Sequence, residues 1–333
     1  MNSRLVLIDG NAILHRAYHA LPPLTAPDGS VVNAVYGFVS ILIKIFNDLK
    51  PTHMAVAFDR PEPTFRKKLY KDYQAKRPEM DRTLVSQIPK VQDVVRAFGI
   101  PIYDKAGFEA DDVIGTLAKQ IASLVIPATA PGSREKKDWI PGQARNDKQW
   151  EIIIVTGDKD ILQLVDDKKG VKVFMPTKGL SEGKLYGEAE VVEKLGVSPK
   201  QIPELKALMG DQSDNYPGVA GIGPKTAVGL INAYGSVKKL YDQGERGDWG
   251  DVGETIKTKL LVGKESAFLS RDLATIRTDV PVEMKPLEAL TTLDTPEARK
   301  KLQEFHFPSL IKRLSGEKAE KQVKRENGQL TLV

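Results

Sequence analysis

The chain of 333 residues contains no cysteine and only four histidines. Without cysteine the protein has no disulfide bond and no thiolate metal site, and so few histidines also argue against structural zinc. No apolar run is long enough to cross a membrane. The N-terminal MNSRLVLIDG has one early arginine and a very short apolar run, which we interpret as a buried strand and not as a signal peptide. We therefore expect a soluble cytoplasmic protein.

The charge balance is basic. The net charge is +5, from 49 basic and 44 acidic residues. If the nine acids considered below form one site, 35 acidic residues remain against the 49 basic ones, a net charge of +14. A basic body with one concentrated acidic spot suits a polyanionic partner and a cationic cofactor. A mildly basic protein without such a partner is the plainer alternative.

The apolar pattern predicts an α/β fold. Three short apolar runs lead directly into acidic segments: 4–8, 54–58 and 152–156. Continuous runs of this length are typical of buried parallel strands. Residues 33–49 and 86–98 show helical spacing, and strands alternating with helices predict a parallel sheet. In such sheets ligands bind beyond the carboxyl ends of the strands, where the acids stand.

The composition and the apolar pattern of the sequence change along the chain. We assign residues 1–184 to an α/β domain and residues 185–315, with their short helical patterns, to a second, helical domain. Residues 316–333 are polar and charged, and we expect them to be disordered. Residues 126–149 carry proline, glycine and mixed charge without a period, which indicates a surface insertion at the sheet edge opposite the acids. A functional insert is the alternative.

Carboxylates gather at the predicted strand ends and helix starts. GFEADDVIG, residues 107–115, places three of them within four positions, and a helix start offsets only part of their repulsion. Any single aspartate could be a helix cap. Nine acids brought to one edge would destabilise the fold if they had no partner. They are Asp9, Asp59, Glu109, Asp111, Asp112, Asp158, Asp160, Asp211 and Asp214.

Hard divalent cations are the partners that such a group of acids favours. Mg²⁺ takes only one or two carboxylates directly, so nine acids predict two or more ions, with outer acids holding waters. Two such ions can stabilise the attacking and leaving oxygens of a phosphodiester. No histidine or cysteine stands near these acids in the sequence to act as nucleophile. Metal-activated water is therefore favoured over a covalent intermediate.

Two further segments carry the chemistry of phosphate binding. PGVAGIGPKTA opens a helix whose free N–H groups and Lys225 can hold a phosphate, although a purely structural turn is the alternative. PTFRKKLYKDYQAKRPEMDR mixes basic groups, which bind phosphates, with aromatic rings, which stack on unpaired bases; a solvated basic helix is the alternative. We assign DNA contacts to Phe65, Arg66, Tyr70, Tyr73, Gln74, Lys76, Arg77, Gly221, Gly223, Lys225 and Thr226.

These motifs together resemble the 5′-nuclease, or flap endonuclease, family, specifically the 5′-3′ exonuclease domain of bacterial DNA polymerase I. The matching pieces, within about residues 4–315, are LIDGNAILHRAYHALPPL, NAVYGF, AFDRPEPTFRKKLYKDYQAKRP, GFEADDVIGTLA, VTGDKDILQLV and GDQSDNYPGVAGIGPKTA. The resemblance implies a PIN-like parallel-sheet nuclease domain with a helical arch, and a helical domain with a helix–hairpin–helix-type (H3TH) DNA-binding motif. It also implies cleavage of branched DNA near a 5′ flap, in replication and repair, with Mg²⁺ or Mn²⁺.

The resemblance extends to single residues. Asp9, Asp59, Glu109, Asp111 and Asp112 resemble one metal cluster of the family, and Asp158, Asp160, Asp211 and Asp214 resemble its other half. Arg77 matches the arginine of the arch. The family's Gly-rich hairpin also holds K⁺ through main-chain carbonyls, which here would include those of Val219 and Ile222.

The chain departs from the family in three respects. The insertion at 126–149 has no counterpart, and no polymerase domain follows residue 333, so we expect a stand-alone nuclease. The arch motif Tyr-Lys-x-x-Arg reads Tyr73-Gln74-Ala75-Lys76-Arg77 here, with Gln74 at the lysine position. If the arch is helical, Arg77 shares the face of Gln74 and Lys76 does not. Arg77 is then the better replacement for the missing cation.

Two other functions stay open. A PIN-type ribonuclease would have fewer acids and no hairpin domain, and a catalytically weak branched-DNA-binding protein would have gaps among the acids. The tail QLTLV, with Gln329, Leu330, Leu332 and Val333, resembles the peptide by which bacterial proteins bind the sliding clamp. A frayed tail is the alternative. We expect a monomer that binds DNA and no membrane.

Overall fold

The computed structural model describes residues 3–124, 150–177, 182–285 and 289–316, and the backbone of two strands in the C-terminal tail. The strands are β1 (Arg4–Asp9), β2 (His53–Ala57), β3 (Ile102–Tyr103), β4 (Glu151–Val155), β5 (Val171–Pro176), β6 (Gly183–Tyr186), β7 (Val323–Glu326) and β8 (Gln329–Leu332). The helices up to the insertion are α1 (Gly10–Ala20), α2 (Asn33–Leu49), α3 (Phe65–Leu69), α4 (Arg82–Val85), α5 (Ile88–Ala97) and α6 (Ala110–Ala122).

The later helices are α7 (Glu188–Leu195), α8 (Ile202–Met209), α9 (Pro224–Tyr234), α10 (Val237–Glu245), α11 (Glu254–Val262), α12 (Lys264–Ala274), α13 (Pro296–Glu304) and α14 (Pro308–Leu314). Three 3₁₀ helices accompany them: η1 (Asp160–Leu164), η2 (Asp167–Lys169) and η3 (Pro199–Gln201). Among the described residues, no helix is long and apolar enough to cross a membrane.

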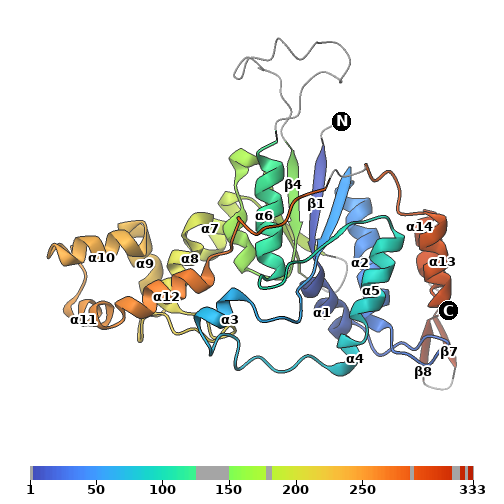
Figure 1. The fold of residues 1–333 in the computed structure, drawn as a ribbon, viewed down its shortest axis with the longest axis horizontal. Helices are drawn as coiled ribbons and strands as arrows, with labels where there is room; N and C mark the ends of the chain where they lie inside the picture. The colour runs from blue at the N-terminus through green and yellow to red at the C-terminus, as the bar shows by residue number, and fades with distance from the viewer. Residues whose placement is uncertain are drawn as a thin grey trace, which may run out of the picture.

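A six-stranded sheet in the order β3-β2-β1-β4-β5-β6 forms the centre of the molecule (Figure 1). The strands β1 to β5 are parallel, and β6 runs antiparallel to β5. Leu5 and Leu7 pack into one core cluster while Val6 and Ile8 pack into another, so both faces of β1 are buried. This explains the continuous apolar runs. The three strands and two helices expected from the sequence are confirmed as β1, β2, β4, α2 and α5.

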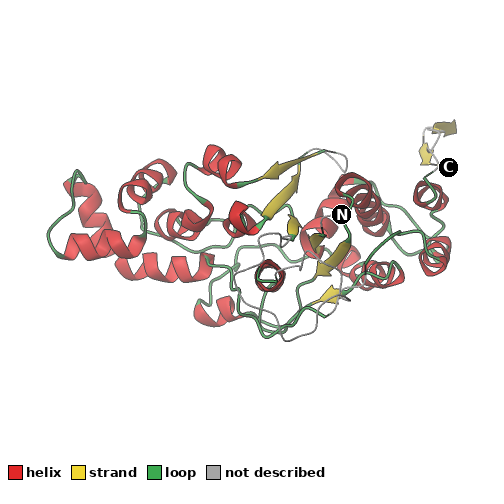
Figure 2. Cartoon of the chain, turned by 90° about the horizontal axis from the view of Figure 1, so that it is seen from above, coloured by secondary structure: helices red, strands yellow, loops and turns green. Residues whose placement is uncertain are grey.

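Helices cover both faces of the sheet (Figure 2). The helix α6 packs on one face through Val113 and Leu117, and α2 and α5 pack on the other through Phe38 and Val94. The helices α7 to α12 continue from the α6 side to one end of the molecule (Figure 1, left). Because α6 follows the acids and runs back along the sheet, its C-terminus and the start of β4 both lie at the edge opposite the acids. The insertion predicted at 126–149 lies outside the described residues.

The last two helices return to the α/β layer. Leu302 of α13 and Leu310 of α14 join the core cluster that contains α2 and α5. The N–H of Leu290 donates to the carbonyl of Thr52 at 2.8 Å, which ties this segment to β2. The helical pattern alone does not show which neighbour a helix covers, and the boundary drawn at 184–185 falls inside β6. The division into domains therefore stays a prediction.

The C-terminal tail differs from the sequence expectation. We predicted disorder for 316–333, yet β7 and β8 pair antiparallel within it. The dipeptide Asn327-Gly328 stands between them in the sequence, and such dipeptides favour two-residue hairpin turns. The polar composition concealed this local signal. The side chains of the clamp-like stretch from Gln329 to Leu332, and Val333 itself, lie outside the described residues.

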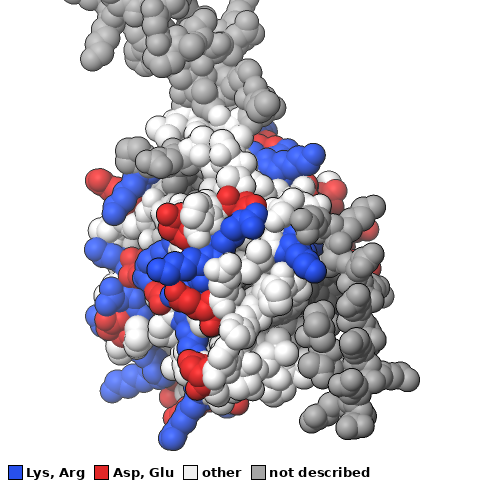
Figure 3. Space-filling view, turned by 90° about the vertical axis from the view of Figure 1, so that its right-hand side faces the viewer, with Lys and Arg blue, Asp and Glu red and all other residues white. Residues whose placement is uncertain are grey.

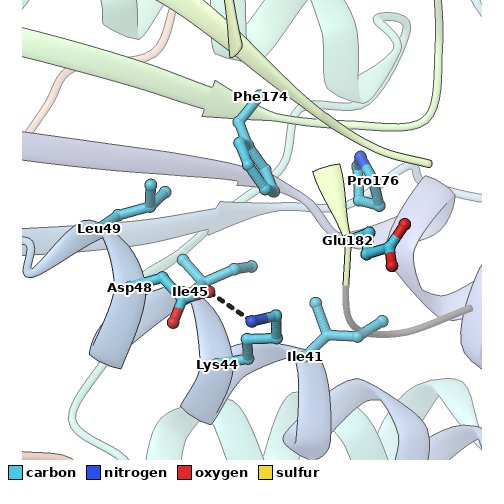
Figure 4. Close-up of a pocket in the computed structure, with 8 residues that line it drawn as sticks. All are labelled: Ile41, Lys44, Ile45, Asp48, Leu49, Phe174, Pro176 and Glu182. Carbon is cyan, nitrogen blue, oxygen red and sulfur yellow. Dashed lines mark hydrogen bonds and ion pairs between the residues drawn. The ribbon is translucent and has the colours of Figure 1, made fainter. Parts of the chain in front are cut away.

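Neither a hollow beside α2 nor the end of the molecule beside α13 and α14 points to a function. A small hollow lies between α2 and the β5–β6 pair, lined by Ile41, Phe174 and Glu182 among others, and none of the nine acids lines it (Figure 4). The face at the right-hand end of Figure 1 shows basic and acidic side chains intermixed on its described part (Figure 3). The predicted acids lie instead at and beyond the carboxyl ends of the strands.

Candidate active site

The inner acids stand where the central strands end. Asp9 is the last residue of β1 and caps α1, because one carboxylate oxygen accepts from Ala12 N at 2.9 Å. The other oxygen accepts from the Thr156 hydroxyl, just beyond β4, at 2.7 Å. Asp59 follows β2, and its carboxylate accepts from Ala110 N at 2.7 Å. As the parallel sheet predicts, the ends of β2, β1 and β4 bring these groups to one edge.

The start of α6 adds the next acids. Glu109 is the N-cap of α6, with Asp111 and Asp112 in its first turn. The Glu109 carboxylate accepts from the Thr64 hydroxyl at 3.2 Å and lies 3.3 Å from the hydroxyl of Tyr73. The helix dipole offsets part of the repulsion among these acids. The structure thus places Glu109 and Asp111 facing the acids at the strand ends.

The inner acids are destabilised as carboxylates. Burial raises the pKa of Asp9 to about 7 and the pKa of Glu109 to about 7. The pKa of Asp111 lies well above its usual value, first through burial and then through repulsion from Asp158, Asp9, Glu109 and Asp59. Loss of hydration also raises the pKa of Asp59, with the Ala110 N–H opposing it. Such clustered, perturbed acids are typical of functional sites, and divalent cations would relieve them.

An outer cluster forms between the start of η1 and the turn that follows α8. Carboxylate oxygens of Asp160, Asp211 and Asp214 all lie within 4.8 Å of one another. Asp160 begins η1, and Asp211 and Asp214 lie in a turn whose backbone is closed by the pairing of Asp211 with Tyr216. Asp158 is exposed between the two groups and its carboxylate accepts from Asp160 N at 2.8 Å. This cluster is one that could hold a metal ion.

Lys206 of α8 was not predicted and stands inside this outer cluster. Its ammonium donates to the carboxylates of both Asp160 and Asp211. Burial raises the pKa of Asp160 to about 6 against the pull of Lys206. Burial would raise the pKa of Asp211, but hydrogen bonds from Lys206 and then from Ser213 lower it. Burial alone would lower the pKa of Lys206, but the two carboxylates raise it, so the ammonium stays charged.

Arg66 and Asp112 do not have the roles predicted for them. Asp112 is fully buried, and its oxygens accept from Arg66 at 2.7 and 2.8 Å, from Arg277 N and from Glu109 N. Arg66 is only 3% exposed and also donates to the carbonyls of Leu273 and Thr275. Arg66 therefore cannot reach DNA, and Asp112 is not free to be a direct metal ligand. The sequence could not show that the inner face of α3 meets the start of α6.

The predicted arch is helical only in part. The helix α3 ends at Leu69, and residues 71–76 form turns in which Gln74 has a φ of +55°. The expectation that Arg77 and Gln74 share a helix face was therefore wrong. Gln74 instead donates through its backbone N to the Asp214 carbonyl at 2.8 Å and through its amide to the Asp214 carboxylate at 3.0 Å. The Gln74 side chain thus fixes the position of Asp214 in the outer cluster.

The aromatic residues of this segment are packed inward. Tyr73 is 3% exposed and stacks on Tyr216 with ring centroids 6.5 Å apart, which leaves no open face for a base. Tyr70 is half-buried beside them, and Phe65 packs against Phe108 at 5.9 Å. Among the described residues, the Tyr216 hydroxyl is a buried side-chain polar atom without a hydrogen-bond partner. The expectation that Tyr73 stacks on DNA bases is wrong.

The exposed basic residues remain candidates for phosphate contact. Lys76 and Arg77 are both exposed, and Arg77 is close enough to oppose the burial that raises the pKa values of Asp59 and Asp214. Gly223 caps α9, whose first turn presents Lys225 and Thr226. Gly221 has a φ of +78°, which favours glycine, and its carbonyl accepts from Lys259 at 3.1 Å. The Val219 carbonyl accepts from Ile222 N at 3.0 Å, and a carbonyl can accept a second bond.

Some of these site residues carried no clear signal in the sequence. Lys206 lies five residues before Asp211, which is not the spacing of neighbours on a helix, and it is the turn after α8 that brings the two side chains into contact. Thr156 reads as the end of an apolar strand. Tyr216 lies beside the acids in the sequence, but its stacking on Tyr73 joins two segments that are far apart along the chain and cannot be seen locally.

Comparison with known proteins supplies the class. Two family profiles match the chain: the 5′-3′ exonuclease N-terminal resolvase-like domain over residues 4–130, and the 5′-3′ exonuclease C-terminal SAM fold over residues 197–299. The 5′-exonuclease of T5 bound to zinc superposes with a TM-score of 0.61 at 20% identity, over 94% of this chain and 97% of that one. The catalytic core of Rad2 with DNA substrate gives 0.59 at 17% identity, over 95% and 92%. The fold is that of these nucleases.

The sequence relatives are more specific. DNA polymerase I of Caldicellulosiruptor bescii is 40% identical over 313 residues, which is 93% of this chain and 33% of the polymerase. DNA polymerase I of Bacillus subtilis is 40% identical over 281 residues, 84% of this chain and 28% of that protein. The chain thus spans a third or less of these relatives. It belongs to the 5′-3′ exonuclease family, as the motifs predicted.

Proposed function

We propose that this chain is a metal-dependent 5′-3′ exonuclease and structure-specific 5′-flap endonuclease that hydrolyses DNA phosphodiesters in replication and repair. The observation that carries the proposal is the convergence of eight acids, from five segments, at and beyond the carboxyl ends of β1, β2 and β4. The zinc bound to the T5 5′-exonuclease and the DNA substrate bound to Rad2 support the same ligands here.

The donor set fits hard divalent cations. Asp9, Asp59, Glu109 and Asp111 would hold one ion, and Asp158, Asp160, Asp211 and Asp214 would hold another, with Mg²⁺ or Mn²⁺ as the metal. The raised pKa values of Asp9, Glu109 and Asp160 support this, because these carboxylates lack enough positive charge in the protein itself. When bound, such ions activate water and stabilise the charge that develops on the phosphate.

The remaining residues position the DNA. Exposed Arg77 can place its guanidinium against a phosphate above the acids. The N-terminus of α9, with Lys225 and Thr226, can hold the backbone of the duplex without reading its sequence. Thr156 and Gln74 fix the orientations of Asp9 and Asp214. The carbonyls of Val219 and Ile222 are proposed ligands for K⁺ at the hairpin.

The test is cleavage of a labelled 5′-flap duplex with Mg²⁺, beside matched single-stranded RNA, with and without EDTA. We expect cleavage near the flap junction that EDTA abolishes, and little cleavage of RNA. Asp111→Asn and Asp158→Asn should abolish cleavage and leave flap binding within a few fold, because the DNA grip lies elsewhere. Preferential RNA cleavage would indicate a PIN-type ribonuclease. Flap binding by the unchanged protein without any cleavage would indicate a DNA-binding protein only.

The organisation and partners are further parts of the proposal. We propose a nuclease domain in 1–184 and a helical H3TH domain in 185–315, working as a monomer on the DNA of the cytoplasmic nucleoid. We also propose that the tail, through Gln329, Leu330, Leu332 and Val333, binds the sliding clamp, which rests on the peptide pattern alone. Clamp pull-down with and without residues 329–333 tests this, and equal retention of both forms would refute it.

A further inference from the structure

The outer acid cluster already has a cation of its own. Lys206 projects from α8 with a side chain only 13% exposed, and its ammonium donates to Asp160 Oδ1 and Asp211 Oδ2. These two acids and Asp214 are the three whose oxygens lie within 4.8 Å of one another. The ammonium thus shares two of the three acids that a divalent ion bound there would need.

Three further oxygens of the cluster are engaged as well. Asp211 Oδ1 accepts from the N–H and the hydroxyl of Ser213 at 2.7 and 2.6 Å. Asp214 Oδ1 accepts from the Gln74 amide at 3.0 Å, and Asp214 Oδ2 lies 3.4 Å from the Tyr73 hydroxyl. The carboxylates are therefore held in place by protein donors before any metal arrives. The strongest of these donors is the charged one, Lys206.

We propose that Lys206 is the resident counter-ion of the outer cluster and competes with a divalent ion for Asp160 and Asp211. A positive charge beside these acids repels a second cation and occupies its ligands, so the outer site binds metal more weakly than the inner one. The lysine stem is flexible enough to withdraw when a metal ion binds. This inference rests on the proposed function, because it assumes that the outer acids hold metal.

The buried Tyr216 hydroxyl provides a second, independent sign of rearrangement. It has no hydrogen-bond partner among the described residues, and the backbone of Tyr216 pairs with that of Asp211, a member of the cluster. Buried polar atoms are rarely left unpaired. If Lys206 withdraws and a hydrated ion enters, a water can reach this hydroxyl.

The experiment measures Mn²⁺ binding to the full chain without DNA, from the free Mn²⁺ signal in electron paramagnetic resonance. The unchanged protein should show a tight and a weak class of site. Lys206→Met and Lys206→Gln, which remove the charge, should tighten the weak class at least tenfold, and Asp160→Asn added to Lys206→Met should abolish that gain. Lys206→Arg keeps the charge, and Lys200→Met removes an exposed lysine paired with Asp166 at 3.9 Å; both should bind Mn²⁺ like the unchanged protein.

The outcomes separate this inference from the function on which it rests. Unchanged or weaker Mn²⁺ binding in both charge-removing variants, with thermal unfolding still cooperative, would refute the role of Lys206 and leave the nuclease proposal standing. Equal tightening in Lys200→Met would also refute it, because the effect would then be one of net charge. If the unchanged protein binds no Mn²⁺ at all, the proposed metal site fails and the inference fails with it.

Discussion

Arg66 shows how one residue can be misjudged from its neighbours in the sequence. It stands in the run FRKK, in which Lys67 and Lys68 are exposed, but its own guanidinium is buried against Asp112. The same guanidinium donates to Leu273 and Thr275, so one side chain ties α3 to the start of α6 and to the end of α12. Arginine suits this role because its planar fork matches a carboxylate with two parallel bonds.

Removing this guanidinium should affect stability much more than DNA binding. We predict that Arg66→Met lowers the free energy of unfolding by about 3–5 kcal/mol, because Asp112 keeps a buried charge without its partner. Urea unfolding in EDTA measures this. Lys68→Met, an exposed neighbour with the same change of charge, is the control and should change stability by less than about 0.5 kcal/mol. A variant of Arg66 as stable as the control would show that the pair contributes little.

Arg77 is the residue to which we assign the missing positive charge of the arch. We predict that Arg77→Ala slows single-turnover cleavage of a flap substrate at least tenfold more than Lys76→Ala does. The reason is no longer helical spacing but the proximity of the charge: burial raises the pKa values of Asp59 and Asp214, and Arg77 lies close enough to oppose that rise. Loss of a cation that stabilises transition-state charge typically costs ~10²–10³ in rate. Should Lys76→Ala prove the more damaging change, Lys76 has the role of the family lysine.

Gln74 allows a complementary test of the same position. A lysine there would add a positive charge near the phosphate and could pair with Asp214 in place of the amide. We predict that Gln74→Lys speeds single-turnover cleavage or leaves it unchanged. A slower enzyme with unchanged flap affinity would indicate that the amide contacts to Asp214 and the Tyr73 hydroxyl matter more than the charge.

At the scale of elements, the sequence predicted well wherever a local pattern decides the outcome. The buried strands read as continuous apolar runs, and an acid follows each within two residues, so the apolar pattern alone locates the edge that carries the inner acids. The segment 70–77 could not be predicted in the same way. Its course is set by Gln74 N bonding to Asp214 and by Asn215 bonding to Asp72, contacts that span about 140 residues.

The position of the predicted insertion yields a test at this scale. The helix α6 ends at Ala122 and β4 begins at Glu151, both at the edge of the sheet opposite the acids. We predict that deletion of residues 128–147 leaves the flap-cleavage rate within a few fold, because the described residues at that edge include none of the site acids. Thermal unfolding should be measured alongside. A hundredfold loss of rate in a folded deletion variant would show that the segment contributes to cleavage.

At the scale of the whole molecule, the clustered acids of the site lower the stability of the folded state when they are ionised. Asp9 and Glu109 have pKa values of about 7 in the folded chain, above the values of 3.8 and 4.5 usual for these groups. A raised folded pKa means that protonation favours the folded state. Its contribution to stability is present below about pH 4 and is lost as the pH rises through 7. The metal-free protein should therefore become less stable across this range.

Divalent metal should reverse that loss where the acids are ionised. We predict that in EDTA the melting temperature falls between pH 5 and pH 8. Mg²⁺ or Mn²⁺ should raise the melting temperature more at pH 8 than at pH 5, because only ionised carboxylates bind the ions. A ligand that binds the folded state stabilises it. Asp111→Asn should reduce both effects, because it removes the acid whose pKa is raised by Asp158, Asp9, Glu109 and Asp59. Scanning calorimetry at fixed ionic strength measures the shifts, with Glu62→Gln, at an exposed acid paired with Arg60, as the control. The prediction would be refuted if the melting temperature in EDTA rose from pH 5 to pH 8 and the metal changed the melting temperature equally at both. In that case the charges of the acids would be balanced by the protein itself, without a metal ion.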